Sequence, residues 1–428
     1  GQKNLLLGSV AGFIVASALC GIAQSLPEMI LFRTLQGALG APLIPVSLSV
    51  MLDSLPRHKH ASTMAVWGAG LMVGPLLGPI VGGWLTENLN WRWVFLLNVP
   101  IGIPALIGCW LTVPKLPHKK HRFDQFGYVL LAISLISFQL MLDRGERQEW
   151  FESIEIILEG GIALSCFLAY IIHTATSVRP LYPRELFGNS NYLIALVLIF
   201  VVGVTLFSSM ALMPPMLQTL YGYPVTFAGL VLSPRGAGTM ISMLLAGRLL
   251  AKIDPRLCVF IGLLLVAWSS YETARFSLEV SWVSFAVTGF VQGTGVGLVS
   301  VPVNILAFST LPGELRPDAT GLYSLTRNIG SAIGISATST LLTRNTQISH
   351  SDLVNAMASL PNWSNSPIDV QAGLIMMNAE ISRQATMIAY LDDFYLLAIL
   401  ALVVSPLLLF LRRPPTIDGN DREHLIME

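Results

Sequence analysis

The sequence predicts an all-α integral membrane protein, a bundle of twelve transmembrane helices. Of its 428 residues, 53% are hydrophobic and only 12% are charged, and the mean hydropathy is +0.66. This composition is typical of membrane proteins rather than soluble globules. Apolar segments of about 20 residues, the length that crosses a bilayer, recur along the whole chain. Several contain Gly and Pro, which a membrane helix tolerates because neighbouring helices satisfy the freed backbone groups.

Twelve segments have the length and apolarity of membrane spans. Two of them, Phe126–Leu142 and Leu257–Tyr271, are short. In chain order the predicted spans are Leu5–Gln24, Glu28–Leu52, Thr63–Leu85, Trp93–Val113, Phe126–Leu142, Ile154–His173, Tyr192–Leu220, Thr226–Ile253, Leu257–Tyr271, Ser281–Leu311, Ala319–Thr343 and Tyr390–Leu411.

Positive charges concentrate in alternate loops, although the net charge is zero. With the first residue in the cytoplasm, fifteen Lys and Arg fall on the cytoplasmic side, six on the other side and four in spans. The positive-inside rule therefore predicts that both termini are cytoplasmic. The basic run from Lys115 to Arg122 lies between two spans, so we interpret it as a topology determinant in contact with lipid and not as a nucleic-acid site.

Loop lengths divide the chain into four parts. Residues 1–113 form a partial N-terminal helix bundle, 114–191 an inserted helix pair with its cytoplasmic loops, 192–411 a C-terminal bundle, and 412–428 a cytoplasmic tail. Within the third part, 344–389 is a long extracytoplasmic loop, in which Leu374–Met387 is predicted to form an amphipathic helix lying on the membrane. Asp392 and Asp393 follow at the outer end of the last span, where we expect both to be solvated.

Several classes of chemistry are not indicated. The four cysteines fall in four different spans without ligand spacing, so they predict neither disulfides nor a metal site. No Gly-Lys pair occurs, which excludes a Gly-Lys-Ser/Thr phosphate loop. We therefore expect no metal, no cofactor and no ATP hydrolysis by such a loop.

The most specific motif runs from Gly70 to Gly83 and contains Gly-Pro-x-x-Gly-Pro-x-x-Gly-Gly over 74–83. It resembles the fifth-helix signature of proton-coupled antiporters of the major facilitator superfamily. The segments Leu31–Gly40 and Asn90–Pro100 resemble the fourth-helix motif, with its buried Arg, and the segment that follows the antiporter motif. Together they are similar to the fourteen-helix drug–proton antiporters of the EmrB/QacA type, over nearly the whole chain.

This resemblance implies a facilitator-type bundle of four, an inserted two and six visible helices. It also implies efflux of amphipathic drugs or toxic small molecules by alternating access, driven by the proton gradient. The implied setting is the inner membrane of a bacterial cell, where a periplasmic adaptor and an outer-membrane channel are possible partners. On this correspondence the first two family helices and their acidic motif are absent, so we expect the present chain not to transport alone.

The resemblance also assigns residues. Arg33, with Gln36 and Gly37 one turn later, is implied to be a coupling or proton-relay cation, and snorkelling to headgroups is the alternative for a charge this shallow. The expected hinge, a close helix contact between the halves, comprises Gly74, Pro75, Gly78, Pro79, Gly82 and Gly83.

A second set of residues is a candidate substrate pathway. Methionine-rich surfaces suit promiscuous binding, although a packing role is equally compatible with these residues. The set comprises Met210, Met213, Met216, Gln218, Arg235, Asn304 and Arg327.

Two other functions stay open at the level of sequence. One is a dedicated exporter of a metabolite, siderophore or lipid, because a fold does not fix its substrate. The other is a transport-dead fragment that acts as a binding scaffold through its extracytoplasmic loop.

Overall fold

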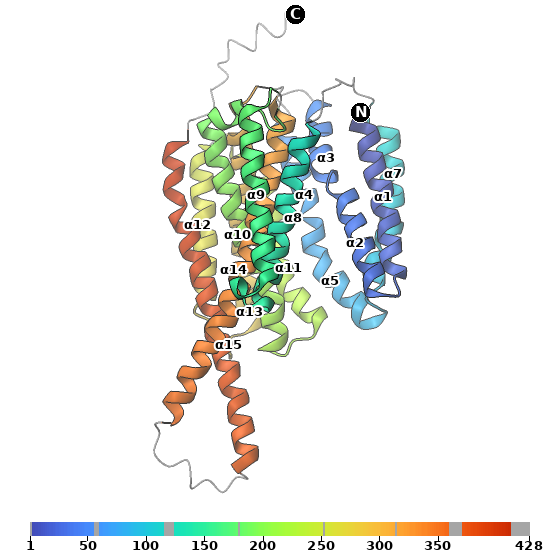
Figure 1. The fold of residues 1–428 in the computed structure, drawn as a ribbon. Coiled ribbons are helices and arrows are strands. Elements are labelled where there is room, and N and C mark those ends of the chain that lie inside the picture. The colour runs from blue at the N-terminus through green and yellow to red at the C-terminus, as the bar shows by residue number, and fades with distance from the viewer. Residues whose placement is uncertain are drawn as a thin grey trace, which may run out of the picture.

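The computed structural model describes residues 2–54, 60–114, 124–178, 180–250, 253–312, 315–358 and 370–411, and within these ranges the regular elements are all helices (Figure 1). The α-helices are α1 Gln2–Ile22, α2 Leu26–Gly40, α3 Leu43–Asp53, α4 His60–Leu71, α5 Val73–Asn88, α6 Trp93–Leu96, α7 Asn98–Thr112, α8 Gln125–Gly145, α9 Ile154–Thr176, α10 Ser190–Thr219, α11 Val225–Leu249, α12 Pro255–Thr273, α13 Trp282–Ser309, α14 Arg316–Ala358 and α15 Val370–Val403.

Prolines break three of the membrane spans into pairs of helices. Pro45, Pro75 and Pro100 lack the N–H that would reach the carbonyl four residues earlier, so Ala41, Leu71 and Leu96 lose a helical partner. The interruptions between α2 and α3, α4 and α5, and α6 and α7 lie at these carbonyls. Each pair still forms one apolar segment, 26, 23 and 20 residues long in chain order.

Eleven helical segments of the described chain are long and apolar enough to cross a membrane. They correspond to eleven of the twelve predicted spans. The remaining one, Ala319–Thr343, lies inside α14. This helix is long enough to cross a membrane, but Arg327, Asn328 and many hydroxyl side chains make it less apolar than the other eleven segments. At 1.5 Å per residue its 43 residues extend about 65 Å, ample for a crossing. The first and last described helices begin and end at the same end of the bundle, as an even number of crossings requires (Figure 1).

The structure has an N-terminal half, α1–α7, and a C-terminal half, α10–α15, with α8 and α9 between them in the chain. The C-terminal half contains most of the buried core. One apolar cluster joins α10, α12, α13 and α14, with Tyr192, Val259 and Leu306 completely buried. A second cluster lies toward the other end and includes Met216 of α10 and Phe394 of α15. In contrast, α2 buries only Gln36, and α7 buries none of its described residues.

The two halves meet where α4 and α5 pack against α11 (Figure 1). The backbones approach closely there, because a Cβ built on Gly229 would lie 2.5 Å from the Pro79 carbonyl oxygen, and one on Gly236 would lie 2.7 Å from Leu76 Cα. Glycine is therefore required on α11 for this contact. Glu87, near the end of α5, accepts hydrogen bonds from the Thr226 amide, at 3.0 Å, and from the Thr226 hydroxyl.

The long loop of the prediction is largely helical. α14 continues to Ala358 and α15 begins at Val370, and together they project from the bundle as a hairpin (Figure 1). The prediction of a separate helix lying on the membrane at Leu374–Met387 is wrong, because these residues belong to α15 and continue directly into the last span. Arg383 anchors the base of this hairpin by donating two hydrogen bonds, at 3.0 and 3.2 Å, to the Leu220 carbonyl. The tip, residues 359–369, lies outside the described residues.

The inserted pair, α8 and α9, packs mainly against itself. Ser134 donates a hydrogen bond to the Ala163 carbonyl at 2.9 Å, and Arg144 forms ion pairs with Glu155 and Glu159. This pair contacts the C-terminal half through Ser336 of α14, which donates to the Leu142 carbonyl at 2.9 Å. The domain boundaries drawn from the sequence remain a prediction.

Asp124 fixes the entry to this pair. It caps α8 by accepting a hydrogen bond from the Gly127 amide at 2.9 Å, and it also binds the Leu181 amide at 3.2 Å and His173 Nε2 at 3.0 Å. Partial burial opposes ionisation, but the hydrogen bonds from Gly127 and His173 outweigh it and hold the pKa of Asp124 below its usual value. One carboxylate thus ties α8, the end of α9 and the following linker together.

Candidate functional site

A pocket with a cavity volume of about 130 Å³ lies between the two halves. Its walls come from α3 and α4 on one side and from α10, α11, α13 and α14 on the other. It lies toward the end of the bundle that holds the α13–α14 connection, away from the Glu87–Thr226 contact. The lining residues are Ile44, Pro45, Leu48, Met64, Trp67, Gly68, Leu71, Met72, Ile199, Val202, Leu206, Phe207, Met243, Val296, Ser300, Val301, Asn304, Phe308, Thr320, Tyr323, Ser324 and Arg327.

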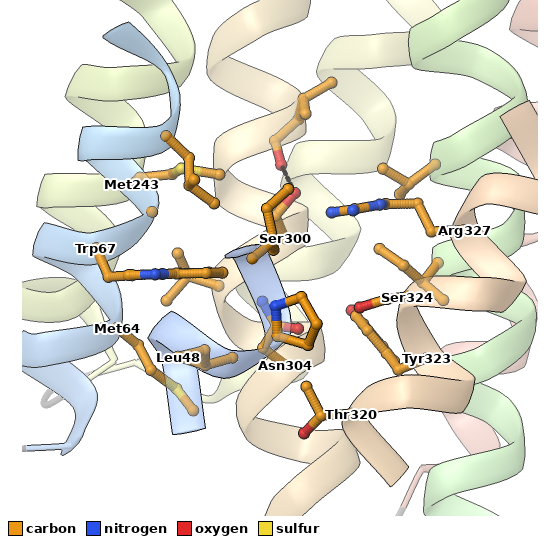
Figure 2. Close-up of a pocket in the computed structure, with 18 of the residues that line it drawn as sticks. Leu48, Met64, Trp67, Met243, Ser300, Asn304, Thr320, Tyr323, Ser324 and Arg327 are labelled. Carbon is orange, nitrogen blue, oxygen red and sulfur yellow. Dashed lines mark hydrogen bonds between the residues drawn. The ribbon is translucent and has the colours of Figure 1, made fainter. Parts of the chain in front are cut away.

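One wall of this pocket is polar and carries a positive charge. Figure 2 shows Thr320, Tyr323, Ser324 and Arg327 together on α14, with the Arg327 guanidinium directed toward Ser300 of α13. Arg327 is the only charged residue among the described lining residues. Its Nε and the Tyr323 hydroxyl are buried without a hydrogen-bond partner in the described chain. Two buried donors without a partner therefore lie in the same wall.

The opposite wall is apolar. Trp67 and Met64 of α4 and Leu48 of α3 lie there, with Met243 of α11 nearby (Figure 2). Trp67 donates its indole N–H to Ser47 at 3.1 Å, which holds the ring at the pocket wall. An apolar wall facing a polar, cationic wall suits an amphipathic ligand.

The predicted substrate pathway is only partly brought together. Asn304 and Arg327 line the pocket. Met213 and Met216, by contrast, are buried in the second core cluster, and Met210 and Gln218 face outward. These four residues do not line the pocket, because this part of α10 lies beyond it toward the hairpin, and their role in a substrate pathway stays a prediction. Other methionines, at 64, 72 and 243, line it instead.

Arg235 does not reach the pocket either. It is buried in the C-terminal half, where Nη1 donates to Ser209 at 3.2 Å and Nη2 donates to the Leu206 carbonyl at 3.0 Å. Ser209 in turn bonds to Gln292 at 3.1 Å. This network joins α10, α11 and α13, which is compatible with a packing role, and the place of Arg235 in a substrate pathway stays a prediction.

Arg33 and Gln36 form a small network in the N-terminal half. Arg33 Nη1 donates to Gln36 Oε1 at 2.9 Å, and the guanidinium lies 5.2 Å from the centre of the Phe95 ring. Gln36 Nε2 donates to Ser17 at 2.5 Å. Within the described residues Arg33 therefore contacts an amide and a ring, and no carboxylate; its role in proton relay stays a prediction. A Cβ on Gly37 would meet nothing within 4 Å.

The glycine-rich string divides into two groups. A Cβ on Gly83 would lie 3.1 Å from Thr226 Cα, and Pro79 is at the close approach to Gly229, so these two residues lie at the contact between the halves. Gly74, Gly78 and Gly82 would each carry a Cβ with nothing within 4 Å. The predicted close helix contact at these three glycines is thus not present among the described residues. Pro75 lies in the first turn of α5, next to the break after α4.

Comparison with known sequences gives one family. The profile of the Major Facilitator Superfamily matches residues 1–335. The multidrug export protein EmrB of Haemophilus influenzae is 33% identical over 358 residues, which cover 82% of this chain and 70% of that protein. EmrB of Escherichia coli K12 is 31% identical, covering 97% of this chain and 83% of the relative. The fatty acid resistance protein FarB of Neisseria gonorrhoeae is 31% identical, with 98% and 85% covered.

Solved structures show the same fold. The human organic anion transporter MFSD10 (TETRAN) matches with a TM-score of 0.57 at 14% identity, over 95% of this chain and 77% of that one. A bacterial homologue of the human lysosomal transporter Spinster, in an inward-facing and unoccupied conformation, matches with a TM-score of 0.55 at 16% identity, over 97% and 85%.

Proposed function

This chain belongs to the Major Facilitator Superfamily, and we propose that it is a secondary transporter that exports amphipathic small molecules in exchange for protons. Its relatives EmrB and FarB carry the names of multidrug export and fatty acid resistance proteins, which support an export function. The transporter would use the proton gradient as its energy source, with no cofactor and no enzymatic step.

The observation that carries the proposal is the two-sided pocket between the halves. A ligand between them can place its apolar part against Trp67 and Met243 and its polar end near Arg327 and Tyr323. Because Arg327 has no acidic neighbour in the described lining, we propose that neutral and anionic amphiphiles are preferred over cationic ones.

The pocket and the contact between α5 and α11 lie toward opposite ends of the bundle. Given the predicted orientation, we propose that this arrangement is an inward-facing state, in which the close contacts at Gly229 and Gly236 and the Glu87–Thr226 bonds seal the outer side. Alternating access would then require that this seal separate while the pocket closes from the inside.

Two ions of the same shape and opposite charge test the substrate class. Tetraphenylborate and tetraphenylphosphonium present matched apolar surfaces, so a difference in their affinity for the purified protein reports the charge of the site. A unit charge about 5 Å from a guanidinium gains about 3 kcal/mol at an effective dielectric constant of about 20. Because the pocket admits water, we expect a smaller preference for the borate, about tenfold.

Arg327→Gln should abolish this preference, and Trp67→Ala should weaken binding of both ions. Trp84→Ala is the matched control, because Trp84 is 51% exposed on the outer half of α5. Equal affinity for the two ions in the wild type would refute the anionic preference. A drug-resistance panel, with and without an uncoupler, tests proton-driven export separately.

The setting is also part of the proposal. We place the protein in the inner membrane of a bacterial cell with both termini cytoplasmic, on the basis of the charge distribution. The hairpin of α14 and α15 would then project into the periplasm, where a periplasmic adaptor that leads to an outer-membrane channel can dock on it. Pull-down of the adaptor with and without residues 346–386 tests this contact.

A further inference from the structure

Asp393 is buried in the last transmembrane helix. Its side chain is 1% exposed, and it is the only carboxylate among the buried residues of the described chain. The prediction that Asp393 is solvated is therefore wrong, whereas Asp392, the preceding residue, is exposed. The difference arises because neighbouring positions on a helix point in different directions, and only Asp393 faces the surrounding α10, α12 and α14.

Both carboxylate oxygens of Asp393 lack a hydrogen-bond partner in the described structure. Its neighbours along α15 are apolar or aromatic, namely Tyr390, Phe394 and Leu397, all members of the second core cluster. Arg235, the one buried cation of the described chain, is bonded to Ser209 and Leu206 and forms no ion pair with Asp393.

The other charged groups near this end of α15 contact partners other than Asp393 or are exposed. On α15 itself, Asp392 accepts a hydrogen bond from Asn345 at 3.4 Å, and Arg383 pairs with Glu380 and the Leu220 carbonyl. Tyr390, one turn before Asp393 on the same helix, interacts electrostatically with it. Other titratable groups at this end are Arg344 of α14, which is exposed, and Glu272 and Arg275 of α12, which form an ion pair. Tyr271 of α12 packs on Tyr395 of α15, and Tyr221 after α10 packs on Tyr223 and donates to the Ser277 carbonyl.

A carboxyl group in such surroundings is unstable as an anion. Ionisation would place a charge in an apolar cluster without a cation or a hydrogen-bond donor to replace the lost water. Uptake of a proton removes this charge. The exposed carboxylate of Asp392, one residue away, lies at the boundary with the projecting hairpin, from which a proton can approach.

We propose that Asp393 is a proton-binding site of this transporter, loaded from the side of the hairpin. The inference rests on the proposed proton-driven export and adds a specific residue of the C-terminal half that binds the proton. The link to the pocket is α14, which bears Asn345 beside Asp392 and, 18 residues earlier, Arg327 in the pocket wall. Movement of α15 on protonation or deprotonation of Asp393 would be transmitted along this one helix over about 27 Å.

Protonation is tested first without any substrate. Infrared spectroscopy of the purified protein detects the carbonyl stretch of a protonated carboxyl group, which shifts in deuterated water. We expect this band at neutral pH in the wild type and in Asp392→Asn, and its loss in Asp393→Asn. A band of equal intensity in Asp393→Asn, or no band in the wild type, would overturn the assignment.

Coupling is tested in proteoliposomes, with anilinonaphthalene sulfonate as an anionic amphiphile of low permeability. With one proton exchanged per molecule, a gradient of one pH unit supports about tenfold accumulation. Asp393→Asn should lose this accumulation and retain exchange of labelled for unlabelled probe at equal pH, whereas Asp392→Asn should retain both. Asp393→Glu should restore part of the accumulation, because it returns a titratable group.

Failure of the inference and failure of the proposed function give different results. If the wild type accumulates the probe but Asp393→Asn does so equally, the proton is carried elsewhere and the inference is wrong. If Asp393→Asn loses exchange together with accumulation, Asp393 is a packing residue and the inference is also wrong. If the wild type exchanges the probe without responding to the gradient, proton-driven export itself is refuted, and the coupling role of Asp393 with it.

Discussion

Replacing Gly236 by alanine is predicted to open the outer seal between the two halves. The Cβ of Gly236→Ala would lie 2.7 Å from Leu76 Cα, 2.8 Å from Leu76 Cβ and 3.0 Å from Leu76 N. Ordinary carbon–carbon contacts are about 3.5–4.0 Å, so α5 and α11 must separate by about 1 Å. Two of the three obstructing atoms are backbone atoms, and a rotamer change therefore cannot relieve the overlap.

Overpacking of this kind costs about 1–3 kcal/mol. If the cost falls on the sealed state alone, the population of that state relative to the alternative falls about 5- to 150-fold. Gly78→Ala is the matched control, because it adds the same methyl group to the facing helix α5 at a position where a Cβ meets nothing within 4 Å. Both variants should insert into the membrane normally, since alanine is more apolar than glycine.

The measurement is the rate at which a membrane-impermeant maleimide labels a cysteine introduced at Ile80, in a background without the four native cysteines. Ile80 is next to Pro79, at the approach to Gly229. Gly236→Ala should raise the labelling rate at least several-fold, and Gly78→Ala should leave it unchanged. Equal rates in the two variants would refute the claim that glycines of α11, and not those at 74, 78 and 82, allow the halves to meet.

Three further predictions follow from other contacts. Glu87→Gln removes the charge from the bonds to Thr226, so the same labelling rate should rise by less than in Gly236→Ala; an unchanged rate would show that these bonds do not hold the seal. Asp124→Asn should lower the thermal stability of the purified protein at neutral pH. Because the pKa of Asp124 is lowered in the folded state, its stabilisation is complete above the unfolded value of 3.8 and is lost as the pH falls through the folded pKa; a difference between variant and wild type that persists at still lower pH would contradict this. Finally, cysteines replacing Lys119 and Ser364 should be labelled in intact cells only at 364, and the reverse result would invert the topology.

Part of the candidate site was predictable. Two residues of the candidate set, Asn304 and Arg327, line the pocket, and their place in a substrate pathway stays a prediction. Trp67 and Tyr323 were missed, because an aromatic residue in a span is equally compatible with lipid, core or pocket. The methionines of α10 lie outside the pocket, and the sequence could not show this, since the side of a membrane helix that faces a pocket is not marked by hydrophobicity.

The sequence by itself determined the membrane character of the chain, the positions of eleven candidate spans, and the family. These properties depend on composition, on segment length against a bilayer about 30 Å thick, and on a local motif, all of which are recorded along the chain. It did not determine where the helices break, because Pro45, Pro75 and Pro100 accompany breaks whereas Pro79 and Pro104 lie inside continuous helices.

Only the tertiary structure decided which residues meet. Gly78 and Gly236 look alike in sequence, but one faces open space and the other lies against Leu76. Asp392 and Asp393 are adjacent and chemically identical, but only one is enclosed, by three helices from distant parts of the chain. In a membrane protein the lipid-facing and protein-facing surfaces are both apolar, so the pattern along a helix does not reveal its partners, and close approach and burial are set by the packing of whole helices.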